Sequence, residues 1–326
     1  MSTVVVQQLD SIVGLQQLIE SRWIKLHDGN QEGVFRYQLE IERERVTDGR
    51  CRFLLQLNRK RTTERRKPDG ISCVIPVFDP SGFNFNKVDS KEVLMEVQSG
   101  DCLITLMVNN SPLTKYHTLV VPDRGRNLAQ ILTKDTLEGV FQVFMMLEDR
   151  HYRMGFNSPG ALASVNHLHY HLMHITHKLY IEDAPLKHLG NHLYLLENPA
   201  RAYCFLYKPT EPAVNFTNQI FHLISVLLSQ NIAHNLFFTW NGSRDIVRAM
   251  IYTRLKPCEN KHVSPFNVAF GEMSGFVPLG DVTHFEQLDE ARLEKLFREA
   301  QGTEDEEGYR LLDQTVLSYL YSMNDE

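Results

Sequence analysis

Apolar and polar residues alternate over several short stretches in the first part of the chain, and this period of two is typical of half-buried β-strands. Residues 34–46 (VFRYQLEIERERV) and 51–58 (CRFLLQLN) flank the turn TDGR and predict a β-hairpin. Three further short strands are expected at 92–97, 102–110 and 116–122, where Gly, Asp, Ser and Pro separate the apolar runs.

One helix is expected among these strands. Residues 134–150 carry apolar side chains at helical spacing behind Thr133, a residue type that often caps helices. Strand-like segments follow at 152–158 and in the histidine-rich run 165–175. This order predicts an α+β fold rather than a repeated β-α-β pattern.

A similar order of elements returns after residue 197. Residues 197–214 contain three prolines, and residues 215–231 carry apolar side chains on one face of a predicted amphipathic helix, namely Ile220, Leu223, Ile224, Leu227 and Leu228. The strands expected at 232–240 and 245–255 flank NGSR, whose Asn-Gly pair favours a hairpin.

Two charged helices are expected near the C-terminus, at 285–299 and 305–323. With 326 residues, 43% of them hydrophobic, the chain is long enough for two domains or for one large fold with a well-buried core. We therefore predict an α+β protein of two halves, residues 1–196 and 197–326, each with an antiparallel sheet and flanking helices.

The composition narrows the class of protein. The formal net charge is −6, from 34 Lys and Arg against 40 Asp and Glu, so a general nucleic-acid-binding role is not indicated. The five cysteines form no C-x-x-C pair, which argues against a disulfide framework or a thiolate zinc site. The first residues lack a secretory signal pattern and no run of about 18 apolar residues occurs. We predict a cytoplasmic protein that does not bind membranes.

The run VNHLHYHLMHI at 165–175 carries the candidate chemistry. In a strand, His167, His169 and His171 share one face. This arrangement allows three interpretations: a polar strand face, a zinc site or a nucleophilic centre. Same-face neighbours lie about 6.6 to 6.8 Å apart and the outer pair about 13 Å apart, which strains a single zinc site. A neutral imidazole with a pKa near 6.5 can attack phosphorus at neutral pH.

Nucleophilic attack on phosphorus also needs donors for the phosphate oxygens and small residues that let the backbone approach. The segment GFNSPGALASVN, directly upstream, supplies such residues: Gly155, Asn157, Ser158, Gly160 and Ser164.

The form His-φ-His-φ-His-φ-φ, in which φ is apolar, resembles the motif of the histidine triad superfamily. The stretch NNSPLTKYHTLVVPD at 109–123 resembles the segment that precedes this motif in the superfamily, with Tyr116 where glycine is usual. Together with FDPSGFNFNKV, IAHNLFFTWNG and FNVAFGEMSG, these blocks resemble the GDP-D-glucose phosphorylases, relatives of the plant GDP-L-galactose phosphorylases. The resemblance covers residues 30 to 280.

The resemblance implies that GDP-glucose and inorganic phosphate are converted to GDP and glucose 1-phosphate through a covalent guanylyl-histidine intermediate, with no metal or other cofactor required. His169 is then the nucleophile, while His171 and His167 bind phosphate oxygens or fix its tautomer. Asn157, Ser158 and Ser164 match phosphate-binding positions. The implied fold is two tandem histidine-triad-like halves, of which the second is degenerate.

The nucleotide contacts rest on two further segments. Arg65, Arg66 and Lys67 match a basic block of the family, although a charge run is equally well explained as a solvated turn. In FNFNK, Phe83 or Phe85 could stack on guanine and Asn86 could bind its edge, by analogy with other base-binding sites; packing of two phenylalanines is the alternative.

Three other functions stay open. One is a GDP-sugar hydrolase, in which water replaces phosphate as the acceptor, and another is a transferase that passes the nucleotide to a different sugar phosphate. The third is a non-catalytic guanine-nucleotide-binding regulator. The expected partners are a GDP-sugar and inorganic phosphate, with a homodimer as one option for the assembly.

Overall fold

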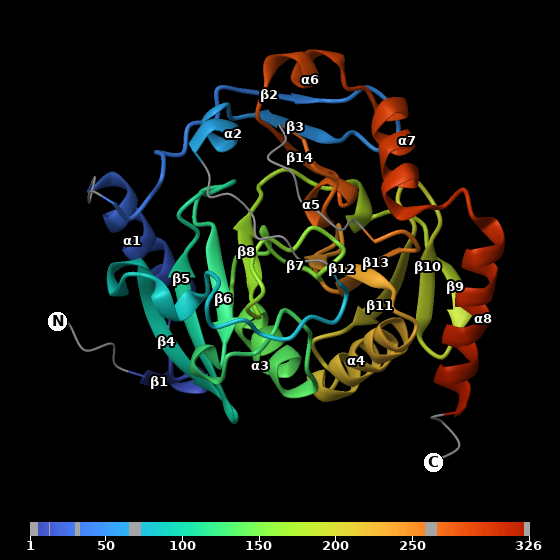
Figure 1. The fold of residues 1–326 in the computed structure, drawn as a ribbon, viewed down its shortest axis with the longest axis horizontal. Helices are drawn as coiled ribbons and strands as arrows, with labels where there is room; N and C mark the ends of the chain where they lie inside the picture. Colours follow the sequence, from blue (N-terminus) through green and yellow to red (C-terminus); the bar gives the residue numbers. More distant parts are fainter. Residues whose placement is uncertain (1–5, 13, 30–32, 65–72, 258–265, 323–326) are drawn as a thin grey trace.

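The computed structural model describes residues 6–12, 14–29, 33–64, 73–257 and 266–322. Within these residues, eleven strands form one large mixed sheet, and three form a small second sheet (Figure 1). The strands of the large sheet, in spatial order, are β1 (Val6–Gln8), β4 (Val93–Ser99), β5 (Cys102–Val108), β6 (Thr118–Pro122), β8 (Tyr170–His174), β7 (Tyr152–Asn157), β12 (Ala233–Trp240), β13 (Val247–Arg254), β11 (Ala202–Tyr207), β10 (Leu193–Leu196) and β9 (Lys187–Gly190). The small sheet has the order β14 (Phe276–Leu279), β3 (Leu54–Leu57) and β2 (Arg43–Val46).

The described helices lie on both faces of the large sheet (Figure 1). The α-helices are α1 (Leu15–Asp28), α2 (Lys60–Glu64), α3 (Lys134–Met145), α4 (Ala213–Ser229), α5 (Phe270–Met273), α6 (Val282–Gln287), α7 (Glu290–Gln301) and α8 (Glu306–Ser322). Short 3-10 helices are η1 (Leu9–Ser11), η2 (Phe85–Lys87), η3 (Ser90–Glu92), η4 (Arg124–Arg126) and η5 (Tyr180–Glu182). None of the described helices is both long and apolar enough to cross a membrane.

The large sheet repeats its own order about the seam between β7 and β12. Outward from the seam, the strands run β7, β8, β6, β5, β4 on one side and β12, β13, β11, β10, β9 on the other. The antiparallel pairing of β7 with β12 therefore fuses the two halves edge to edge into one sheet. This confirms the expected α+β fold of two halves; the domain boundary at residue 196 stays a prediction.

The two halves differ in the connection that follows the strand at the seam. In the first half, residues 158–169 join β7 to β8, whereas in the second half the short turn 241–246 joins β12 to β13. The long connection carries His167 and His169, so the repeated topology carries the histidine motif in one half alone.

Each face of the large sheet is covered by a separate hydrophobic core. On one face, α1, α3, α4 and α8 pack against alternate strand residues such as Leu172 and Leu236. On the other face, the small sheet, α5 and α7 pack against the remaining residues, including Met173 and Phe237. This alternation is the strand periodicity expected from the sequence.

Most predicted elements are found, with shifted ends. The hairpin around TDGR forms between β2 and β3, and NGSR joins β12 to β13. Residues 34–42, predicted as strand, form none; β2 starts at Arg43. The expected helix at 285–299 is split between α6 and α7, where Asp289 accepts a hydrogen bond from Arg292 N and starts a new helix.

Candidate active site

The histidine run lies where the chain enters β8. The strand begins at Tyr170, so His167 and His169 precede it in the connection from β7. The alternation still holds, because Leu168 and Tyr170 are fully buried in the helix-covered core. The ring centroids of His169 and His171 lie 5.1 Å apart, which places the two imidazoles side by side.

Gln130 explains why the strand starts late and why His169 has a defined tautomer. The fully buried Gln130 side chain lies between Asn157, at the end of β7, and His169, just before β8. Its Nε2 donates to Asn157 O (3.0 Å) and His169 O (3.1 Å), and its Oε1 accepts from His169 N (2.9 Å). His169 Nδ1 faces two acceptors, Gln130 Oε1 at 2.9 Å and His167 O at 2.8 Å. A nitrogen between two acceptors carries the proton, so the lone pair of neutral His169 lies on Nε2.

His171 is oriented by a second histidine. Leu113 N donates to His117 Nδ1 (3.0 Å), so the proton of neutral His117 is on Nε2, which lies 3.1 Å from His171 Nδ1. Asn109 Nδ2 lies 3.2 Å from the same His117 nitrogen, but as a donor it cannot receive that proton. His171 Nδ1 is therefore the acceptor, and Nε2 of His171 carries a proton. Burial, with a contribution from the positive charge of Arg61, lowers the pKa of His117 to about 3.

The His167 ring contacts the backbone of two surrounding segments. Its Nδ1 accepts from Phe85 N (3.0 Å) and its Nε2 lies 3.1 Å from Arg124 O. Burial lowers the pKa of this imidazole to about 4, which keeps it neutral at physiological pH. Both nitrogens thus contact backbone groups, and the His167 carbonyl, rather than its ring, faces His169.

The other predicted site residues separate into two groups. Ser164 and Phe85 line a cavity with His169 and His171, and the Phe85 ring lies 5.0 Å from that of His169. Asn157 lies on β7, which pairs with β8, and its Oδ1 accepts from Asn235 Nδ2 (2.6 Å).

Asn157 does not line the cavity, and two further predicted residues do not line it either. Ser158 is buried, and its Oγ accepts from His234 N (2.9 Å) and donates to Pro159 O (2.9 Å), so it supports the seam. The Asn86 amide donates to Asn127 Oδ1 (2.8 Å), and Asn86 does not line the cavity. The basic residues Arg65, Arg66 and Lys67 lie outside the described residues.

A side chain of the second half contacts the triad. Phe270, at the start of α5, packs against His171 with ring centroids 5.6 Å apart. Gly155 is paired with His171 across β7 and β8, and a Cβ on it would lie 2.4 Å from Phe270 Cε2. Glycine is therefore needed here so that the phenylalanine ring can reach the histidine.

A buried polar chain crosses the seam behind the site. Arg254, on β13, donates from Nε to Asn235 Oδ1 (3.1 Å), and Asn235 in turn donates to Asn157 Oδ1. The guanidinium also donates to Val268 O. A cation of the second half thus fixes Asn235, and through it the side chain of Asn157 at the end of β7.

The cavity in front of the triad has a volume of about 150 Å³. Its walls combine apolar side chains with polar ones, and the polar lining comes from α2, η3, the chain after β5, Ser164 and the histidines. The described lining residues are Arg61, Phe83, Phe85, Val88, Glu92, Met107, Val108, Asn109, Asn110, Ser111, Leu113, His117, Leu119, Ser164, Val165, His169 and His171. Charged side chains among them are Arg61 and Glu92, which the sequence did not single out.

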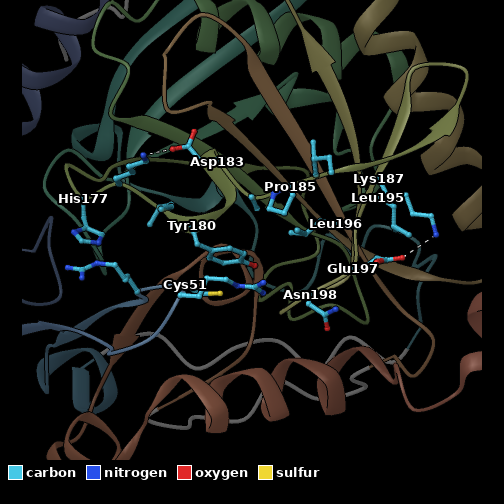
Figure 2. Close-up of a pocket in the computed structure, with 16 residues that line it drawn as sticks. Cys51, His177, Tyr180, Asp183, Pro185, Lys187, Leu195, Leu196, Glu197 and Asn198 are labelled. Carbon is cyan, nitrogen blue, oxygen red and sulfur yellow. Dashed lines mark hydrogen bonds and ion pairs between the residues drawn. The ribbon is translucent and has the colours of Figure 1, made fainter.

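A larger cavity of about 700 Å³ lies beside β10 and the chain that leads into β9 (Figure 2). It contains Cys51, whose thiol pKa is raised to about 11 by burial and by the nearby negative charge of Glu290. Figure 2 also shows an ion pair at its edge between Lys187 and Glu197, at 3.4 Å. Of the described residues that line it, none belongs to the triad; His169 and His171 line the smaller cavity instead.

Two groups of described side chains could hold a metal ion, each with its three ligand atoms within 4.8 Å of one another. One consists of Asp149, His151 and His174, and the other of Cys51, Glu290 and Glu294. Neither group includes a triad histidine. In the first group, the two oxygens of Asp149 already contact the imidazoles, at 2.7 Å from His151 Nδ1 and 2.8 Å from His174 Nε2.

Comparison with known proteins places this geometry in a family. The family models described as GDPGP1-like, N-terminal domain, and GDPGP1-like, C-terminal domain, match residues 14–173 and 177–322. GDP-D-glucose phosphorylase 1 of Danio rerio is 35% identical over 82% of this chain and 81% of the relative. GDP-D-glucose phosphorylase 1 of Homo sapiens is 34% identical over 79% of this chain and 73% of the relative.

More distant proteins share the fold. GDP-L-galactose phosphorylase 1 of Arabidopsis thaliana is 25% identical over 94% of this chain and 73% of the relative. The crystal structure of yeast Ap4A phosphorylase Apa2 in complex with Ap4A superposes with a TM-score of 0.60 at 14% identity, covering 89% of this chain and 98% of that chain. The two matched domains and the curated relatives agree over most of the sequence, and the chain belongs to the GDPGP1-like family of phosphorylases.

Proposed function

We propose that this protein is a GDP-sugar phosphorylase that converts GDP-D-glucose and inorganic phosphate into GDP and glucose 1-phosphate. The observation that carries the proposal is the tautomer of His169, whose Nδ1 proton is held by two acceptors so that Nε2 keeps its lone pair. The relatives called GDP-D-glucose phosphorylase 1 support the choice of substrate.

In the first step, His169 Nε2 attacks the α-phosphorus of the GDP-sugar. A nitrogen–phosphorus bond forms, and the bond from the α-phosphorus to the bridging oxygen breaks. Glucose 1-phosphate, whose phosphate group is the former β-phosphate, leaves with the bridging oxygen and the electron pair of that bond. The Nδ1 proton stays between Gln130 and the His167 carbonyl, which stabilises the positive charge that develops on the ring.

In the second step, an oxygen of inorganic phosphate attacks the guanylyl phosphorus and His169 leaves, which produces GDP. The Nε2–H group of His171, set by His117, is a donor for the phosphate oxygens or the leaving oxygen in both steps. Arg61 supplies a positive charge at the cavity wall for an anionic substrate, a role for which the sequence had suggested Arg65 and Arg66.

The test is release of GDP and glucose 1-phosphate from GDP-D-glucose, with and without inorganic phosphate. Phosphate-dependent release should be lost in His169→Ala and retained in His188→Ala, which removes an exposed histidine on β9. Incubation of the intact protein with GDP-D-glucose without phosphate should leave a guanylyl group on His169, detectable by mass spectrometry of its peptide.

Other outcomes would indicate a different function. Equal release without phosphate identifies a hydrolase, and nucleotide binding without turnover of any GDP-sugar identifies a regulator. Full turnover by His169→Ala would refute the assignment of the nucleophile. The homodimer and the domain division at residue 196 stay predictions, to be tested by the solution mass and by limited proteolysis.

A further inference from the structure

The cavity contains a carboxylate, whose negative charge would repel the phosphates of an anionic substrate. Glu92, at the end of η3, lines the cavity together with the two histidines. Its Oε2 accepts from Asn110 Nδ2 (3.3 Å), and the Asp89 backbone also donates to the carboxylate. Both donors are neutral. Burial raises the pKa of the Glu92 carboxyl, the expected effect of placing a carboxylate in a partly apolar wall.

The register of the sheet locates Glu92 relative to the nucleophile. Val93 pairs with Met107, Met107 pairs with Leu119, and Leu119 pairs with His171, so these residues form one row across four strands. Three strand spacings separate Val93 from His171, or about 14 Å. Glu92 directly precedes Val93 and therefore lies at the far end of the cavity from the histidines.

This distance decides which part of a bound nucleotide can reach Glu92. A nucleotide with its α-phosphorus at His169 has its ribose about one strand spacing away, over the region of Leu119. At that position the ribose hydroxyls are too near the histidines to contact Glu92. An extended nucleotide reaches the far end of the cavity with the outer edge of its base. The base would lie among the apolar side chains there, Phe83, Val88 and Met107.

The chemistry at that end selects among bases. A carboxylate is an acceptor only, with two oxygens. The Watson–Crick edge of guanine presents two adjacent donors, the N1–H and the 2-amino group, which match the two oxygens of a carboxylate. Adenine presents an acceptor at N1 in the same place, so its lone pair would face the carboxylate charge. Hypoxanthine keeps N1–H but lacks the amino group.

We propose that Glu92 binds the N1–H and 2-amino groups of guanine and so determines the base specificity of this enzyme. The inference rests on the proposed function, because it takes a guanylyl donor as the substrate whose α-phosphorus faces His169. It also explains why a carboxylate lies in this cavity: the charge is distant from the phosphates and meets the donors of the base.

The experiment compares GDP-glucose with inosine diphosphate glucose as substrates for the intact protein, Glu92→Ala and Glu92→Gln. The intact protein should favour GDP-glucose by roughly ten- to a hundredfold in kcat/KM, the order of discrimination that a bidentate contact to a base edge gives. Glu92→Ala should reduce that ratio to near one, and Glu92→Gln, which keeps one acceptor, should give an intermediate ratio. Asp101→Asn, at the exposed turn between β4 and β5, should keep the full ratio.

The outcomes separate this inference from the proposed function. If Glu92→Ala lowers kcat/KM equally for both substrates, or if the intact protein shows no preference, the role of Glu92 in base recognition is refuted while phosphorolysis stands. If the intact protein turns over neither substrate, the proposed function fails, and the affinities for GDP and IDP, measured by calorimetry, still test Glu92. A preference for GDP that is equal in the intact protein and in Glu92→Ala overturns the inference in that case as well.

Discussion

Gln130 is the residue whose loss tests the architecture of the site most directly. Gln130→Met keeps the length of the side chain and removes its four hydrogen bonds, to Asn157 O, His169 O, His169 N and His169 Nδ1. At about 1 kcal/mol for each bond, the free energy of unfolding should fall by about 4 kcal/mol. The change is large for one side chain because all four bonds are made at a fully buried position.

The same variant should slow the chemistry. His169 Nδ1 would keep one acceptor, the His167 carbonyl, and the ring would lose the bond that fixes it from the other side. We expect transfer of the guanylyl group to slow by roughly tenfold or more, since small misplacements of a reacting group cost that order. KM should change less, because Gln130 does not line the cavity.

The assays are urea unfolding and the rate of a single turnover with excess enzyme. Gln287→Met, at an exposed position of α6, is the matched control and should change neither quantity. A Gln130→Met protein that unfolds within about 1 kcal/mol of the intact chain and transfers at the same rate would refute the role assigned to these hydrogen bonds.

Three further predictions follow from the same region. Gly155→Ala should destabilise the protein by about 1–3 kcal/mol because its Cβ would overlap the Phe270 ring, and adding Phe270→Ala should recover part of that loss; additive losses in urea unfolding would contradict the contact. Tyr116 has a φ of 61°, so Tyr116→Gly should be more stable than Tyr116→Ala by about 1 kcal/mol in thermal or urea unfolding, and the reverse order would show that the left-handed backbone is not the governing factor. Burial lowers the pKa of His117 to about 3 and of His234 to about 4, below the usual 6.5, so the unfolded chain binds more protons than the folded chain below pH 6.5. The free energy of unfolding should therefore fall as the pH drops from 6.5 toward 4, by up to about 1.4 kcal/mol per pH unit for each histidine. Equal stability at pH 7 and pH 5 would contradict this.

The sequence predicted the parts of the site that lie close together along the chain. Alternation in the run 165–175 was enough to place the three histidines on one side, because a strand-like backbone repeats every two residues. It was not enough to separate their roles. The structure does so through backbone groups: Phe85 N and Arg124 O contact the His167 ring, while His169 faces carbonyl oxygens.

The residues that the sequence did not reveal reach the site from elsewhere in the fold. Gln130 lies in the chain before α3, and no spacing relates it to His169. Glu92 lines the cavity together with His171 although a row of four strands, β4, β5, β6 and β8, lies between their positions, and only the register of the sheet determines this. His117 was present in a recognised segment, but its link to His171 requires the pairing of β6 with β8. Tyr116 keeps the turn before it by adopting the backbone conformation that glycine usually supplies.

The unequal connections at the seam limit how this protein could be altered. On β13, Val247–Arg254 are paired with β12 along the whole strand, and residues 247–252 are also paired with β11, so histidines introduced there would enter an existing ladder of hydrogen bonds. Residues 158–169 instead leave a gap beside β7 that the Gln130 amide fills. A second histidine motif in the C-terminal half therefore requires an insertion in place of the turn 241–246, whereas point substitutions on β13 would be insufficient. Conversely, a deletion that removes His167 and His169 should abolish the proposed activity while the strands of the sheet, which lie outside residues 158–169, stay in place.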